Sequence, residues 1–265
     1  NSSLSNNVIL SLAERENKLW IGTDGGGINI LEPETGQLSL LEHIPGRDNY
    51  SLPANSILSL YNDRNNNIWA GSIRNGLISI REVSMVTYTD VVPGNDRGLS
   101  NNTILSLYQQ SDDKIWIGTD GGGINLFDPA TGKFHHILST WEEKVASITG
   151  MDKDNLLVSL FSQGLFIFHK ETHRYQPLVI INDSINDILC HRGKTVNVYQ
   201  NTPETILMLS ETPYKYHIGK KQFIPITKGK GITDIVGTLL PINSTGEDCY
   251  LHDLEHIYQI NSSLN

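Results

Sequence analysis

Polar side chains recur at matching places in a repeated sequence, and hydrogen bonding is the chemistry that they could do. The segment KLWIGTDGGGINIL at residues 18–31 returns as KIWIGTDGGGINLF at residues 114–127, with weaker copies at 67–80 and 155–168. One Gly is common to all four copies, whereas the three residues before it vary. A constant frame with variable contents is typical of a binding surface. The candidate ligand-binding residues on these turns, and on the segments before each repeat, are Asn7, Asp24, Asn55, Arg74, Asn75, Asn102, Asp120, Ser162 and Gln163.

Amide, carboxylate and guanidinium groups that converge in this way suit a hydroxyl-rich ligand such as a sugar. The alternative is that each Asn or Asp only caps a turn, as these residues commonly do. The constant Gly at positions 27, 76, 123 and 164 predicts a positive φ or a close backbone approach. Residues 25–27 are not a phosphate cradle, because the apolar segment that follows is a predicted strand and not a helix.

The elements that must position these residues follow from the repeat. Trp20, Trp69 and Trp116 lie 49 and 47 residues apart, which is a spacing typical of propeller blades. Short runs rich in Val, Ile and Leu, separated by Asn, Asp and Gly clusters, predict four strands per repeat. In the first repeat these strands are expected at residues 8–12, 19–23, 28–31 and 37–44.

The predicted fold is all-β, a β-propeller of four-stranded antiparallel blades with about six repeats, as a fragment or an incomplete or atypical ring. In the two faint repeats, first strands are expected at residues 185–188 and 232–235, and second strands at 205–209 and 249–251. We expect one propeller segment over residues 1–265, with repeats at 3–49, 50–97, 98–143, 144–183, 184–230 and 231–265.

Aromatic and hydroxyl side chains at repeated positions have structural interpretations. The three repeated Trp residues lie in the middle of predicted strands and are expected to be core between blades, whereas Trp141 lies outside the repeat and is a candidate exposed aromatic. A further set of polar residues falls on the first strands and is expected to satisfy backbone groups. This set is Ser11, Ser59, Ser106, Ser147, Asp187 and Asp234.

Catalytic and metal chemistry find little support in the sequence. No G-x-S-x-G elbow or Ser-His-Asp arrangement can be assembled. The nine His residues show no metal-ligand spacing, so neither a metal nor another cofactor is expected. Cys190 and Cys249 are 59 residues apart, without CxxC spacing. Buried free thiols are the favoured interpretation, and a disulfide between them stays open.

Charge and hydropathy exclude several classes of partner. With 29 acidic and 20 basic residues the net charge is -9, which disfavours nucleic acid and anionic membrane surfaces. No apolar run approaches the roughly 18 to 20 residues that span a bilayer, and the first residues lack a signal-peptide pattern. We expect no direct membrane insertion by this segment.

The repeated residues resemble the two-component regulator propeller repeats. The residues that carry the resemblance are 6–7, 20–23, 25–27 and 32–36, and again 101–102, 116–119 and 128–132. The resemblance implies the periplasmic sensor region of a hybrid two-component histidine kinase of Bacteroidetes. Such sensors typically respond to oligosaccharides. It therefore implies a periplasmic, non-catalytic sensing segment whose partners are an oligosaccharide and the remaining sensor domains of the parent chain.

The chain departs from the family pattern in the number of its repeats. Family propellers usually have seven blades, whereas six repeats can be counted here, and the last lacks an outer strand. Unpaired edges favour a homodimer or an incomplete ring. Two other functions remain open, a protein interaction scaffold and a propeller lyase or glycosidase. A glycosidase would need two carboxylates at a set separation, which the sequence cannot show.

Overall fold

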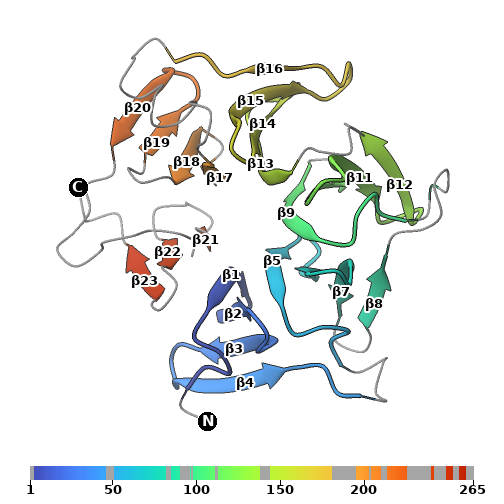
Figure 1. Cartoon of the computed structure of the whole chain (residues 1–265). Helices are drawn as coiled ribbons and strands as arrows, with labels where there is room; N and C mark the ends of the chain where they lie inside the picture. The colour runs from blue at the N-terminus through green and yellow to red at the C-terminus, as the bar shows by residue number, and fades with distance from the viewer. Residues whose placement is uncertain are drawn as a thin grey trace. The chain divides into compact units, whose positions relative to one another are not determined.

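Strands make up the regular structure of this protein. The computed structural model describes residues 3–45, 51–81, 85–89, 96, 98–110, 113–137, 144–180, 195–202, 204–209, 214–225, 240–241, 249–252 and 257–260. These ranges contain antiparallel sheets and no helix, and so no helix that is long and apolar enough to cross a membrane. The sheets are the blades of a β-propeller (Figure 1), which confirms the predicted fold class. The chain forms two compact units, Asn1–Glu142 and Glu143–Asn265.

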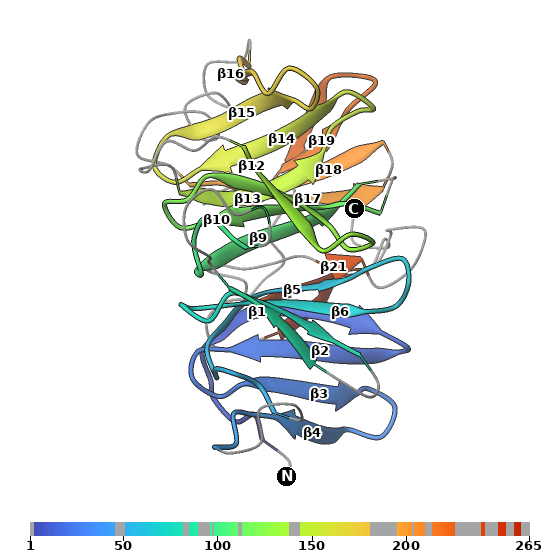
Figure 2. The same ribbon diagram turned by 90° about the vertical axis from the view of Figure 1, so that its right-hand side faces the viewer.

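Three four-stranded blades make up the first unit, and each sheet keeps its strands in sequence order. Figure 2 shows the four strands of the first blade side by side. The strands are β1 (Ile9–Arg15), β2 (Lys18–Thr23), β3 (Ile28–Glu32) and β4 (Gln37–Leu41); β5 (Ile57–Asn62), β6 (Ile68–Ser72), β7 (Leu77–Ile80) and β8 (Met85–Tyr88); and β9 (Ile104–Gln109), β10 (Ile115–Thr119), β11 (Ile124–Asp128) and β12 (Lys133–Ile137).

The second unit contains two four-stranded sheets and one sheet with three described strands. Its strands are β13 (Val145–Gly150), β14 (Asn155–Leu160), β15 (Gly164–His169) and β16 (Tyr175–Pro177); β17 (Asn197–Thr202), β18 (Thr205–Leu209), β19 (Tyr214–His217) and β20 (Gln222–Pro225); and β21 (Leu240–Pro241), β22 (Cys249–His252) and β23 (Ile257–Ile260).

The first strands of the two faint repeats differ from the prediction. The expected segments, 185–188 and 232–235, lie outside the described residues. The strand that pairs with β18 is β17, and the strand that pairs with β22 is β21. Val196 and Val198 are buried, but the polar residues Thr195 and Asn197 alternate with them, so this segment lacks the apolar run on which the prediction relied. The second strands, β18 and β22, lie where they were expected.

Burial falls from the second strand of a blade to the fourth. Strands β6 and β10 are buried at every residue, whereas β4 has no buried residue. Trp20 packs with Ile57 and Leu60 of the next blade, and Trp69 packs with Phe127 in the same way. Because both faces of β6 are covered, one by the first blade and the other by the third, its apolar residues are consecutive instead of alternating.

A Gly in the second strand allows neighbouring blades to approach closely. A Cβ atom added to Gly71 would lie 2.6 Å from Cβ of Ile104, the first residue of the next blade's first strand. A Cβ added to Gly22 would lie 3.0 Å from the carbonyl oxygen of Ile57, at the same place one blade earlier. The Gly of the W-x-G sequence is therefore a packing requirement.

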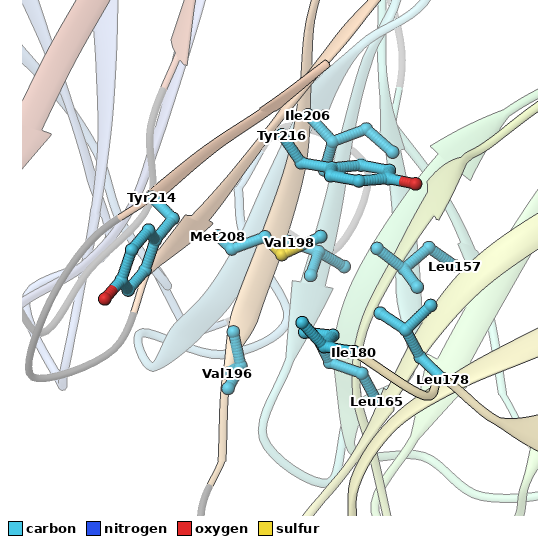
Figure 3. Packing of buried hydrophobic residues seen from close by; sticks show 10 residues of the cluster. All are labelled: Leu157, Leu165, Leu178, Ile180, Val196, Val198, Ile206, Met208, Tyr214 and Tyr216. Carbon is cyan, nitrogen blue, oxygen red and sulfur yellow. The ribbon is translucent and has the colours of Figure 1, made fainter. Parts of the chain in front are cut away.

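The second unit has its own core between its first two blades. Figure 3 shows Leu157, Leu165 and Leu178 of one blade facing residues of the next blade. The residues contributed by that next blade include Val198, Ile206, Met208 and Tyr216. This cluster is apolar apart from the tyrosine hydroxyls, so it stabilises the unit by burial alone.

A β-bulge recurs in the first strand of the four clear repeats. In the first blade the pairing register shifts between Ile9 and Ser11, and the other three clear repeats shift at the equivalent place. The extra residue re-aims the Ser side chain. The Ser11 hydroxyl donates to the carbonyl oxygen of Ile57 on the next blade at 3.3 Å, and Ser147 does the same to Val196 at 3.2 Å.

The role predicted for the repeated Ser residues is confirmed for Ser11 and Ser147. Ser147 also accepts a hydrogen bond from the amide of Val198 at 3.0 Å. The prediction is wrong for Ser59, whose buried hydroxyl has no partner among the described residues. Asp187 and Asp234 lie outside the described residues.

Candidate functional site

The Gly turns, which join the second and third strands of a blade, are closed by the same pair of hydrogen bonds throughout the first unit. In the first blade the amide and the hydroxyl of Thr23 both donate to the carbonyl oxygen of Gly27, each at 3.0 Å. In the second blade Ser72 donates in the same way to Gly76, at 3.0 and 2.9 Å. A short hydroxyl residue at the end of the strand thus fixes the turn, whichever residues lie between.

The constant Gly has a positive φ in all four clear repeats. The φ angles are 74° at Gly27, 76° at Gly76, 68° at Gly123 and 93° at Gly164. A Cβ atom at Gly27 would also overlap the carbonyl oxygen of Leu41. Backbone conformation and space therefore both require Gly, and the prediction for this position is confirmed.

The Gly turns of the first and second blades lie beside the segment that leads into the first strand of the next blade. The amide of Gly27 donates to the carbonyl oxygen of Asn55 at 2.7 Å, and the amide of Gly76 donates to that of Asn102 at 2.9 Å. These bonds gather the Gly turns and the lead-in segments of the first unit at one end of its blades. The predicted site residues of this unit all lie on those turns and segments.

Asn55 and Asp24 already use part of their polar surface inside the protein. The side-chain oxygen of Asn55 accepts a hydrogen bond from the amide of His43 at 2.7 Å. The Asp24 carboxylate accepts one from the Ser56 hydroxyl at 2.8 Å, although the residue itself is exposed. Asn7 is exposed as well. Asn55 therefore caps a loop, whereas Asn7 and Asp24 present polar atoms to solvent.

The second blade presents Arg74 and Asn75. Arg74 is exposed and has a φ of 64°, and within the described residues no carboxylate forms an ion pair with it. The Asn75 side-chain amide lies 3.5 Å from the carbonyl oxygen of Pro53 and is half-buried. The guanidinium group is the one positive charge on the Gly turns of the first unit.

The third blade contributes Asn102 and Asp120, both half-buried. The side chain of Asn101 links these segments. It donates to the carbonyl oxygen of Asp120 at 2.7 Å and accepts from the amide of Thr103 at 2.7 Å. The first Asn of the pair is therefore a cap, and the second has its backbone carbonyl on the Gly turn of the preceding blade.

In the second unit the Gly turn carries Phe161, Ser162 and Gln163, all exposed. The Ser162 amide donates to the hydroxyl of Thr195 at 3.1 Å, and Ser162 has a φ of 56°. The Phe161 ring is 52% exposed, and the Lys144 ammonium lies 5.8 Å from its centroid. These residues form a candidate site within the second unit.

Phe161 was missed as a site residue by reasoning from sequence. Its signal is a large apolar side chain at a turn position that holds Asp24 and Asp120 in two other repeats. The candidate exposed aromatic, Trp141, lies outside the described residues. The expectation that the three repeated Trp residues are core is confirmed, because Trp20, Trp69 and Trp116 are 8%, 1% and 2% exposed.

The opposite end of each blade, where the first and second strands meet, has a structural role. Burial raises the pKa of Tyr61 to about 12 and raises the pKa of Tyr108 at the equivalent place. The Asp63 carboxylate is buried and bound by the amides of Asn65 and Asn67, at 2.9 and 2.8 Å. The Asp63 carboxylate therefore holds its turn together.

Metal and thiol chemistry add nothing to the site in the part of the chain that the structure describes. There, no three His, Cys, Asp or Glu side chains gather so as to hold a metal ion. Cys190 lies outside the described residues, and only the backbone of Cys249 is described, within β22. The state of the two thiols stays a prediction.

Comparisons with solved structures show the same fold in proteins of different function. The extracellular domain of a putative hybrid two component system from B. thetaiotaomicron is 16% identical, with a TM-score of 0.69, over 97% of this chain and 40% of that domain. Virginiamycin B lyase from Staphylococcus aureus is 12% identical, with a TM-score of 0.60, over 97% of this chain and 86% of the lyase. The chain thus spans less than half of the two-component domain. The fold alone does not decide between sensing and catalysis.

Sequence comparison identifies the repeats. No curated protein matches the chain. The model of the two component regulator propeller matches residues 3–25, 51–74 and 98–121. Each match runs from a lead-in segment through the first two strands into the Gly turn, and it ends two residues before the constant Gly. The chain therefore carries two component regulator propeller repeats.

Proposed function

We propose that this chain is the ligand-sensing propeller segment of a two-component sensor and that its ligand is an oligosaccharide. The observation that carries the proposal is the contrast within the Gly turns. Thr23, Ser72 and Thr119 close them with the same bonds, while the three residues between are Asp-Gly-Gly in the first and third blades and Ile-Arg-Asn in the second. Variable loop residues on a rigid scaffold are a common basis of ligand recognition.

The side chains on the Gly turns and lead-in segments suit a sugar as the ligand. Asp24 and Asn7 can exchange hydrogen bonds with hydroxyl groups, and Asn75 and Gln163 carry amides that both donate and accept. The exposed face of Phe161 offers an apolar plate of the kind on which the C–H face of a sugar ring can lie.

The two component regulator propeller repeats and the likeness to an extracellular two-component domain support a place in such a sensor. The site would then face the periplasm, and the signal would pass through the remaining sensor domains of the parent chain to a cytoplasmic histidine kinase. A ligand can do this only by binding one of two conformational states more tightly than the other. We place residues 1–265 in one propeller segment, with a homodimer as its assembly.

Two other functions make different predictions. A protein interaction scaffold is favoured by Leu40 and Val86, which are 41% and 40% exposed on the fourth strands of neighbouring blades. A lyase or glycosidase would need a catalytic pair of acid and base groups at the Gly turns. We propose that the segment has no such activity.

A thermal unfolding screen against defined neutral and acidic oligosaccharides tests the proposal. At about a hundredfold excess over its dissociation constant, a ligand adds about 2.7 kcal/mol, which raises Tm by about 5 to 10 °C in a chain of this size. A panel of chromogenic glycosides is incubated in parallel. A Tm shift without turnover supports a sensor. Turnover would make it an enzyme, and a flat screen would favour the scaffold.

A further inference from the structure

Arg74 occupies a turn position at which two other blades have Gly. The second residue of the Gly turn has a positive φ in all four clear repeats, with 83° at Gly25, 64° at Arg74, 90° at Gly121 and 56° at Ser162. Only Gly adopts this conformation without a steric cost, because Cβ of any other L residue approaches the backbone. The second blade therefore keeps an Arg where Gly would be easier to accommodate.

The fold does not use the Arg74 side chain. The turn is closed by backbone and Ser72 hydrogen bonds to Gly76, and it is tied to its neighbours through the backbone of Ile73 and Gly76. The Arg74 side chain is exposed, and none of the described carboxylates pairs with it. Backbone strain that packing does not explain is most often retained at functional sites.

We propose that Arg74 is a specificity-determining residue that binds a carboxylate of the ligand, so that the oligosaccharide contains uronic acid. This inference rests on the proposed function and names the ligand class of the same site. The planar guanidinium group matches a carboxylate with two parallel N–H···O hydrogen bonds, which Lys cannot form.

The net charge of the protein favours some classes of acidic ligand over others. A net charge of -9 repels a densely sulfated chain, because many anionic groups would be held near an acidic protein. One guanidinium group at the tip of a turn can still pair with a single carboxylate at short range. A ligand with isolated carboxylates therefore fits this surface better than a polysulfate does.

Isothermal titration with matched sugars tests the inference. The probes are oligomers of galacturonate, mannuronate and glucuronate, the same oligomers after reduction of their carboxyl groups, and a sulfated oligosaccharide. The variants are Arg74→Gly and Arg74→Lys. Two controls are Arg64→Ala, which removes an exposed Arg at the opposite end of the same blade, and Lys221→Gly, which relieves the same strain at an exposed turn in the second unit.

The parent protein should bind one uronic-acid series at least tenfold more tightly than its reduced form. Arg74→Gly should abolish that preference while its Tm is equal or higher, and Arg74→Lys should lose about tenfold in affinity. Both controls should bind as the parent does. Binding of neutral oligosaccharides alone, an unchanged Arg74→Gly variant, or a preference for the sulfated probe would overturn the inference and leave the proposed function standing. Binding of no probe, neutral or acidic, would overturn both.

Discussion

The indole nitrogen of Trp69 donates a hydrogen bond to the carboxylate of Asp63 at 2.8 Å, and both residues are buried. The bond joins the turn between β5 and β6 to the core between the second and third blades, because Trp69 also packs edge-on against Phe127. Trp20, one repeat earlier, has no such partner among the described residues, and the Arg15 guanidinium lies 6.0 Å from its ring. The indole N–H at this position therefore has a partner in the second blade and none among the described residues in the first.

Replacing Asp63 with Asn should destabilise the protein by about 1 to 3 kcal/mol, because the new amide places N–H donors against donors that now lack an acceptor. Urea unfolding followed by Trp fluorescence measures the change. Asp113→Asn is the matched control. It alters an exposed carboxylate in the corresponding turn of the third blade and should stay within about 0.5 kcal/mol of the parent. Equal losses in the two variants would contradict a special role for Asp63.

Gly71→Ala should destabilise the protein by about 1 to 3 kcal/mol through overpacking, because the new Cβ would lie 2.6 Å from Cβ of Ile104. Gly219→Ala is the control, since the nearest atom to its Cβ, Cε1 of His217, would be 4.0 Å away and no left-handed φ is involved. That control should be neutral or slightly stabilising. The new Cβ would also overlap the hydroxyl oxygen of Ser59 in the same blade, so an unfolding midpoint equal to that of the parent would contradict the close packing around Gly71.

The sequence was sufficient for the features that repeat. Trp20, Trp69 and Trp116 recur within strong apolar runs, and such runs can be buried only between layers, so their core role could be predicted. The positive φ of Gly27 and its equivalents could also be predicted, because a position that accepts only Gly while its neighbours vary points to a backbone constraint.

Features that depend on tertiary contacts could not be read from the sequence. The bulge before Ser11 leaves no mark in the residue types, since its effect is to aim a side chain at Ile57 in another blade. The left-handed conformation of Arg74 could not be predicted either, because Arg is not a residue type that indicates a positive φ. Strand β17 was not predicted because Val196 and Val198, at its start, alternate with polar residues.

Tyr61 should make stability fall at alkaline pH. Burial raises its pKa in the folded protein to about 12, above the value of 10.0 for a free side chain, while a hydrogen bond with the backbone of Gln109 opposes the shift. The contribution is fully present below pH 10 and is lost as pH rises to about 12, because the unfolded state ionises first. The loss is at most about 3 kcal/mol. Tyr61→Phe should therefore change the slope of unfolding free energy against pH only above pH 10. Parallel profiles for parent and variant would contradict the shift.

Phe161→Ala should weaken binding of the oligosaccharide that gives the largest Tm shift, by about fivefold, because a stacked aromatic contact contributes about 1 kcal/mol. Stability should change by no more than about 0.5 kcal/mol, since the ring is 52% exposed and its contact with Lys144 is weak at the surface. Tyr175→Ala removes another exposed aromatic, on the fourth strand of the same blade, and should leave the affinity unchanged. Isothermal titration separates the two. If Phe161→Ala and Tyr175→Ala bound equally well, the aromatic tip of the second unit would not touch the ligand, and recognition would have to be assigned to the polar turns of the first unit.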